Sequence, residues 1–87
     1  MKLNKESIEC LKIIEHYTNT KGHVGLSILE RNLFDLIGFD YAIQNNIRLT
    51  SIIDMLSKEG FVIEEGLSNK ITEKGREFLK QHKESQA

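Results

Sequence analysis

The residue types that most often carry out chemistry are scattered along this 87-residue chain. The three histidines, His16, His23 and His82, are far apart, and no carboxylate or thiol stands at a spacing that would complete a metal site with them. Cys10 and His16 would differ by about 600° of rotation on one helix, so they cannot form a nucleophilic pair. We therefore expect Cys10 to be a small apolar residue at the edge of the core.

Other catalytic patterns are missing from the sequence as well. No glycine-rich loop follows a predicted strand, no paired carboxylates stand in a cleft-forming context, and so short a chain leaves little volume for a pocket. The sequence thus predicts a protein that is not an enzyme and that uses no metal, cofactor or small-molecule ligand.

Composition limits the remaining classes of protein. The 12 Lys and Arg residues against 13 Asp and Glu residues give a net charge of −1, which argues against a protein that coats nucleic acid through bulk charge. The lone cysteine cannot form an internal disulfide, so packing alone must stabilise the core. No apolar run approaches the roughly 18 residues of a membrane span, and the N-terminus lacks the apolar segment of a signal peptide. We therefore expect a cytoplasmic protein with no membrane partner.

The first half of the chain predicts two helices separated by a short extended segment. Apolar residues recur at helical spacing over about residues 5–18, behind a candidate N-cap at Asn4. Residues 23–26 have room for a strand of two or three residues. A capping box at Ser27–Glu30 predicts the start of a second helix, and Gly38 predicts its end. The apolar stripe of this helix consists of Leu29, Leu33, Leu36 and Ile37.

Residues 39–46 allow two interpretations. Asp40 could cap a short helix that ends at the pair of asparagines, or one helix could continue to Glu59. From Ile47 onward the helical spacing is clear, and Gly60 predicts the end of the helix. The inward positions are Leu49, Ile52, Ile53 and Leu56, and the outward positions are Arg48, Ser51, Asp54 and Lys58.

A β-hairpin and a final helix complete the predicted domain. Residues 61–65 and 70–72 are the predicted strands, joined by a turn. Thr72 caps the last helix, and the polar tail from about His82 is expected to fray. The expected apolar contacts are Phe61, Ile63 and Ile71 in the hairpin and Phe78 and Leu79 in the helix. Residues 1–87 thus predict one α+β domain that is mostly helical.

Two stretches of the chain follow a familiar order. The helix that contains Leu49, Ile53 and Leu56 ends in Ser57-Lys58-Glu59-Gly60-Phe61-Val62, and the last helix begins within Ile71-Thr72-Glu73-Lys74-Gly75-Arg76-Glu77-Phe78-Leu79. Over this region the sequence resembles the winged helix-turn-helix superfamily of small transcriptional regulators, and the first helix resembles it loosely. The resemblance implies a three-helix core, a short β-hairpin called the wing and a C-terminal helix. Gly75, in the first turn of that helix, suggests close backbone packing against a neighbouring element.

Two features depart from the pattern of that family. The connection from Gly38 to Asn46 is longer than the usual tight turn of three or four residues before the recognition helix. The wing is short and acidic, because Glu64 and Glu65 precede its turn and Lys70 is the one cation that follows. A DNA-binding wing usually offers Arg or Lys to a phosphate or to the minor groove.

The resemblance implies a transcriptional regulator that binds double-stranded DNA sequence-specifically, with its third helix in the major groove. Arg48 has the donors for a guanine edge, asparagines suit adenine, and hydroxyls suit phosphate or thymine. The expected contact residues are Asn45, Asn46, Arg48, Thr50, Ser51 and Lys70.

Partners follow from the same resemblance. We expect a homodimer that binds two half-sites, with Leu3, Tyr17, Phe78 or Leu79 left over from the core for the dimer contact. The alternative is a winged-helix module that binds another protein and no nucleic acid. The acidic wing and the near-neutral charge favour that alternative.

Overall fold

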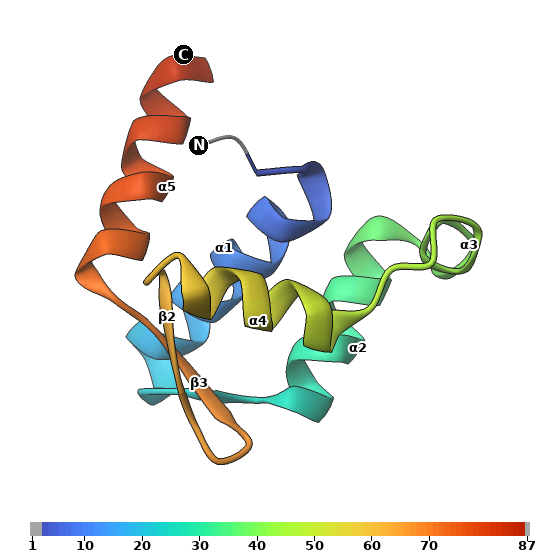
Figure 1. Ribbon diagram of the computed structural model, residues 1–87, viewed down its shortest axis with the longest axis horizontal. Helices are drawn as coiled ribbons and strands as arrows, with labels where there is room; N and C mark the ends of the chain where they lie inside the picture. The colour runs from blue at the N-terminus through green and yellow to red at the C-terminus, as the bar shows by residue number, and fades with distance from the viewer. Residues whose placement is uncertain (1–2, 87) are drawn as a thin grey trace.

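Helices make up most of the chain, and three short strands form one antiparallel sheet (Figure 1). The computed structural model describes residues 3–86. In chain order the elements are α1 (Lys5–Lys21), β1 (Val24–Gly25), α2 (Leu26–Ile37), α3 (Phe39–Gln44), α4 (Leu49–Lys58), β2 (Val62–Glu65), β3 (Ser68–Ile71) and α5 (Glu73–Gln86). The predicted mostly helical α+β class is confirmed. α5 continues past His82, where the sequence predicted fraying, to Gln86.

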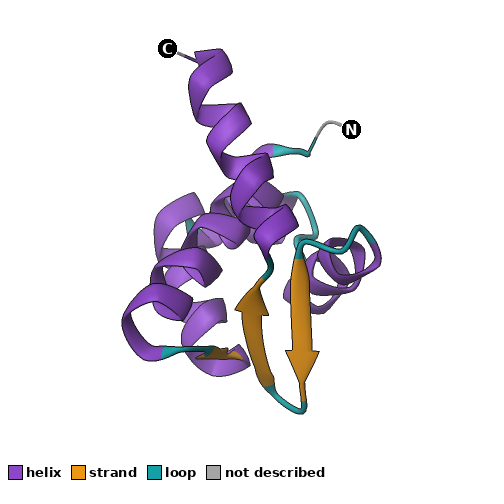
Figure 2. Cartoon of the chain, turned by 90° about the vertical axis from the view of Figure 1, so that its left-hand side faces the viewer, coloured by secondary structure: helices purple, strands orange, loops and turns teal. Residues whose placement is uncertain are grey.

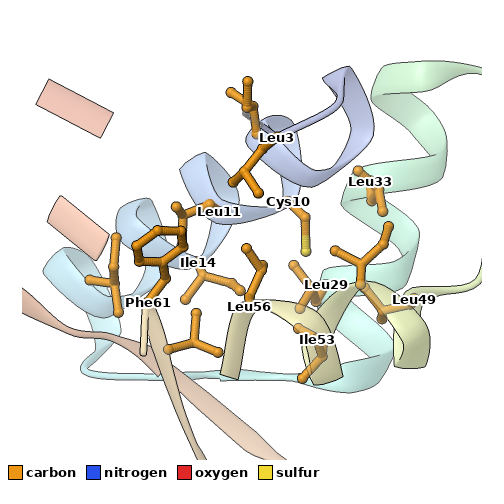
Figure 3. Close-up of a cluster of buried hydrophobic side chains, with 14 of the residues drawn as sticks. Leu3, Cys10, Leu11, Ile14, Leu29, Leu33, Leu49, Ile53, Leu56 and Phe61 are labelled. Carbon is orange, nitrogen blue, oxygen red and sulfur yellow. The ribbon is translucent and has the colours of Figure 1, made fainter. Parts of the chain in front are cut away.

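α1 lies at the centre of the hydrophobic core (Figure 3). Its side chains Cys10, Leu11 and Ile14 are completely buried, and so are Leu29 of α2 and Leu56 of α4. The elements α2, α4, α5, β1 and β3 all contact this helix. Burial of one such side chain contributes about 1.5–3 kcal/mol, so this cluster is the main source of stability in a chain without a disulfide.

The ends of α1 follow the signals in the sequence. The backbone N–H of Ser7 donates to Asn4 Oδ1 at 3.0 Å, so Asn4 is the predicted N-cap. Gly22 ends the helix with a φ of 89°, in the left-handed region that glycine adopts without strain. Near this end the Thr18 hydroxyl accepts a hydrogen bond at 3.1 Å from the Ile71 N–H, which fastens α1 to β3.

The start of α2 differs from the prediction. Gly25 is the N-cap, in an extended conformation and without a side-chain hydrogen bond, so the capping box of Ser27 and Glu30 does not form. The reason is that Gly25 pairs with Ser68 in the sheet, and the chain passes directly from β1 into the helix. The apolar stripe is also shorter than predicted, because Leu36 is 57% exposed at the end of the helix.

Two separate helices occupy the region that the sequence left open. α3 begins after Gly38, whose φ of 93° and ψ of 132° end α2, so Asp40 is not the cap. Asn46, with a φ of 51°, lies in the left-handed region and separates α3 from α4. The four predicted inward positions of α4 are all buried, and Leu56 among them has no exposed surface. Gly60, with a φ of 80°, turns the chain back over the helix.

The three strands lie in the order β1-β3-β2, and Figure 2 shows β2 and β3 side by side. Val62 faces Ile71 across this pair, and both are buried. The prediction that Ile63 would be buried is wrong: neighbouring residues of a strand point to opposite faces, and Ile63 is 49% exposed. β2 is an edge strand whose last two residues, Glu64 and Glu65, are exposed.

The hairpin and α5 are fastened to the end of α4 by Thr72 and Gly75. The Thr72 hydroxyl donates to the Gly60 carbonyl at 2.6 Å and accepts from the Gly75 N–H at 3.0 Å, so Thr72 is the predicted helix cap. A Cβ added to Gly75 would overlap the Phe61 carbonyl oxygen and would come within 2.8 Å of Ile71 Cγ1. The close packing predicted for Gly75 is confirmed.

Replacement of Gly75 by alanine should therefore destabilise the fold. We expect Gly75→Ala to lower the free energy of unfolding by about 1–3 kcal/mol in urea denaturation, although alanine is the better helix former. The matched control is Gly25→Ala, because a Cβ there meets no atom within 4 Å. Equal losses in the two variants would show that close packing does not explain the glycine at position 75.

Candidate nucleic-acid interface

The N-terminal end of α4 is open to solvent. Arg48 is its N-cap residue, and its extended backbone (φ −122°, ψ 119°) is joined to the helix without a side-chain cap. Arg48, Thr50 and Ser51 are all exposed here, while Leu49 between them is buried. The first amide groups of a helix have no carbonyl partner within the helix, and the helix dipole gives them partial positive charge. This end can therefore accept an anion next to a guanidinium and two hydroxyl groups.

The two asparagines lie in the connection that leads to this end. The Asn45 side chain donates from Nδ2 to the Tyr41 carbonyl at 2.9 Å, so one of its donors is already used by α3. Asn46 is exposed, and its left-handed backbone turns the chain toward α4. The Ile47 N–H donates to the Ala42 carbonyl at 2.9 Å, which fixes the connection against α3.

Two open hollows lie on either side of Arg48, and each contains an acidic residue. The larger, of about 460 Å³, lies between α2 and the start of α4 and includes Glu30 and Thr50. The smaller, of about 260 Å³, lies beside the start of α1 and includes Glu6 and Ser51. The apolar lining of the larger hollow consists of Leu26, Phe34, Ile47 and Leu49. The surface around Arg48 thus has mixed charge rather than a continuous positive stripe.

Lys70 lies apart from the other expected contact residues. It stands on β3, its Nζ is 3.5 Å from Glu65 Oε1, and it lines neither hollow beside Arg48. The ion pair is exposed and therefore weak. It nevertheless gives Lys70, the one cation of the hairpin, a carboxylate partner within the hairpin. The structure brings together Asn46, Arg48, Thr50 and Ser51 with Asn45 beside them, and leaves Lys70 outside the group.

Two cations of α5 contact residues of other parts of the chain. Arg76 Nη1 lies 3.8 Å from Glu15 Oε2 on α1, and Lys74 Nζ lies 5.6 Å from the centre of the Phe61 ring. Lys80 is exposed and alternates with glutamates along the helix. The alternation of exposed charges of both signs favours the interpretation of this face as a solvated helix surface.

Cys10 lies inside the core and not at its edge. The side chain has no exposed surface, and desolvation by burial raises the pKa of its thiol to about 12. A thiol in this state is a poor nucleophile at neutral pH. Within residues 3–84, no three His, Cys, Asp or Glu side chains form a group that could hold a metal ion. No helix in the described part of the chain is long and apolar enough to cross a membrane.

The residues expected to form a dimer contact are part of the core instead. Leu3 and Leu79 are buried, and Tyr17 and Phe78 pack against the core with partial exposure, so none is left over. Sequence reasoning missed a different set of exposed apolar residues, which are Ile28, Leu36, Phe39, Tyr41, Ile43, Ile63 and Leu67. Four of these seven lie in or next to α3, the segment in which the helical spacing was weakest.

The chain was compared with known protein families, proteins and structures. No protein-family model, curated protein or solved structure matches this sequence or fold.

The raised pKa of Cys10 predicts how stability depends on pH. Its ordinary pKa is 9.0 and its folded pKa about 12, so above pH 9 the unfolded chain releases the thiol proton while the folded chain keeps it. The free energy of unfolding should therefore fall by up to about 1.4 kcal/mol per pH unit between pH 9 and 12. Cys10→Ala, measured by urea denaturation over the same range, should lack this component, because the other titrating groups are common to both proteins. Parallel curves for the two proteins would contradict the burial of a neutral thiol.

Proposed function

We propose that this protein is a small transcriptional regulator of the winged helix-turn-helix type, which binds double-stranded DNA through the N-terminal end of α4. The observation that carries the proposal is the open end of that helix. Arg48, Thr50 and Ser51 are exposed around backbone amide groups that have no side-chain cap. Such a helix end binds phosphate, and an arginine at this place has the donors to recognise a guanine.

The arrangement of the elements supports the same proposal. α2 and α4 flank one hollow, as the two helices of a helix-turn-helix unit would, and the β2–β3 hairpin and α5 follow in the order that the resemblance implies. The helix pair is joined by α3 and not by a tight turn, so the unit is an elaborated one. In such a unit the second helix enters the major groove with its N-terminal residues.

The charge around α4 limits the strength of DNA binding by one copy. Glu6 and Glu30 line the hollows beside Arg48, and the hairpin offers Lys70 already paired with Glu65. Few phosphates would be neutralised, so the salt dependence should be shallow, with a slope of about 0.9 per phosphate contact. Useful affinity then requires base contacts and two copies on two half-sites.

The alternative function is a protein-interaction module with the same architecture. Mixed charge at the start of α4 favours it, because Arg48 between Glu6 and Glu30 could pair with a partner that carries both signs. The two functions differ in one measurable property, which is association with duplex DNA at low salt.

Arg48→Ala tests the groove contact directly. A preferred duplex is first selected from a random DNA library, and its dissociation constant is then measured by fluorescence anisotropy over a salt series. We expect the substitution to weaken binding of that duplex by about 1–3 kcal/mol, because a base-contacting arginine loses both hydrogen bonds.

The matched control for this experiment is Lys80→Ala. It removes one positive charge from an exposed position on α5, on the other side of the molecule from the start of α4 (Figure 1). Its affinity should stay within about 0.5 kcal/mol of the unmodified protein. Folded protein that does not associate with any duplex at low salt would refute the regulator and favour the protein-interaction module. Equal losses in the two variants would refute the role of Arg48.

A further inference from the structure

The larger hollow beside Arg48 has a charge of opposite sign on each of its two walls. On α2, Leu26, Glu30 and Phe34 are spaced four residues apart, so one side of that helix forms the first wall. Arg48 and Thr50, at the start of α4, form the second wall. We call this space the α2–α4 hollow. It presents a carboxylate on one wall and a guanidinium on the other.

The floor of the α2–α4 hollow is fixed by the core. Leu49, which lines it, is 5% exposed and belongs to the same buried cluster as Leu29 and Leu33 of α2 (Figure 3). Ile47 lines the hollow as well, and its N–H donates to the Ala42 carbonyl at 2.9 Å. The hollow is therefore formed before a ligand arrives, and no segment has to be ordered on binding.

The two charges of the α2–α4 hollow are not neutralised by the protein. Among the side chains of residues 3–84, the ion pairs include neither Glu30 nor Arg48. Both residues are exposed, so water solvates them when the hollow is empty of ligand. Opposite charges that line one hollow without pairing are complementary to a ligand that carries both signs.

Ligands of other kinds do not match this arrangement. An anion attracted by Arg48 would meet the carboxylate of Glu30, and a cation attracted by Glu30 would meet the guanidinium of Arg48. An uncharged apolar ligand would cover both charges and pair with neither. A ligand with a cationic group, an anionic group and an apolar body satisfies both walls and the floor.

We propose that the α2–α4 hollow binds a free α-amino acid with an apolar side chain. The ligand carboxylate accepts hydrogen bonds from the Arg48 guanidinium and the Thr50 hydroxyl, and the ligand ammonium group pairs with Glu30. The ligand side chain lies against Phe34 and Leu49. The volume of about 460 Å³ is within the roughly 300–1,000 Å³ of small-molecule sites, whose linings are mostly apolar with a few polar groups.

The sequence predicted no small-molecule ligand for a physical reason. The lining comes from two segments, 26–34 and 47–50, which only folding brings together. Neither segment contains a motif that indicates a ligand, and the two opposite charges are 18 residues apart in the chain, at Glu30 and Arg48.

Regulation of DNA binding follows from the shared residue Arg48, and this part of the inference rests on the proposed function. A bound amino acid engages the guanidinium that a guanine would require and covers the start of α4, so the ligand and the duplex exclude each other. At a ligand concentration ten times its dissociation constant, the apparent dissociation constant for the duplex should rise about tenfold.

An NMR titration of the nitrogen-15-labelled full chain with leucine tests the site. The ligand is small and the hollow is open, so we expect a dissociation constant between about 0.1 and 10 mM. The amide signals of residues 26–34 and 47–50 should shift, and those of α5 should not.

Three related compounds test each part of the ligand separately. N-acetyl-leucine lacks the cation, leucinamide lacks the carboxylate and glycine lacks the apolar side chain, so each should bind at least about fivefold more weakly than leucine. Absence of shifts at about 50 mM leucine, or equal binding of all four compounds, would overturn the proposal.

Glu30→Gln separates the ammonium contact from the shape of the hollow. The substitution keeps the size of the side chain and removes its charge, so leucine should bind at least about fivefold more weakly while N-acetyl-leucine binds as before. The matched control Glu84→Gln removes a carboxylate from an exposed position on α5 and should leave leucine binding unchanged. A Glu30→Gln protein that prefers leucine to N-acetyl-leucine as strongly as the unmodified protein would overturn the proposal.

Fluorescence anisotropy with the selected duplex, with and without leucine, separates the ligand site from the proposed function. Leucine should weaken duplex binding by the unmodified protein, and ten times more leucine should be needed in Glu30→Gln than its fivefold weaker binding alone excludes as unchanged. Leucine binding by a chain that binds no duplex would keep the ligand site and refute the regulator. Duplex binding by a chain that binds no leucine would do the reverse. Simultaneous binding of leucine and duplex would refute the shared use of Arg48.

Discussion

Burial of one face of α1 is the constraint on which the rest of the structure depends. Cys10, Leu11 and Ile14 reach no solvent, and the helix contacts α2, α4, α5, β1 and β3. A chain of 87 residues without a disulfide has room for one core, so these five elements each present an apolar side to this helix. Thr18 adds a directional contact at one end, and the start of α4 faces solvent because its buried residues are fixed against the core on the other side.

The helices were predictable because their apolar residues recur at the positions that face the core. The inward positions of α4 and the caps Asn4 and Thr72 depend on local spacing, and the structure has them as predicted. The errors arose where a contact distant in sequence decides the outcome. Pairing of Gly25 with the hairpin removes the capping box of Ser27, and pairing of Val62 with Ile71 turns Ile63 outward. The pairing of Gly25 has no local signal, and the turn residues that predicted the hairpin do not fix which face Ile63 takes.

The candidate site was predictable only in part, for a related reason. Exposure of Arg48 and Ser51 follows from the phase of α4, because they lie opposite its buried stripe. The acidic neighbours Glu6 and Glu30 come from α1 and α2, so only the folded chain shows that the surface around Arg48 is mixed. α3 is too short for its spacing to indicate a face, which is why the exposure of Phe39 could not be read in advance.

The acidic hairpin has a consequence for aggregation. β2 is a free edge strand, and a free edge exposes backbone groups that can pair with a strand of another molecule. Glu64 and Glu65 are exposed on this edge, so a second copy that tried to extend the sheet would place four carboxylates close together. The two glutamates therefore disfavour strand-to-strand aggregation.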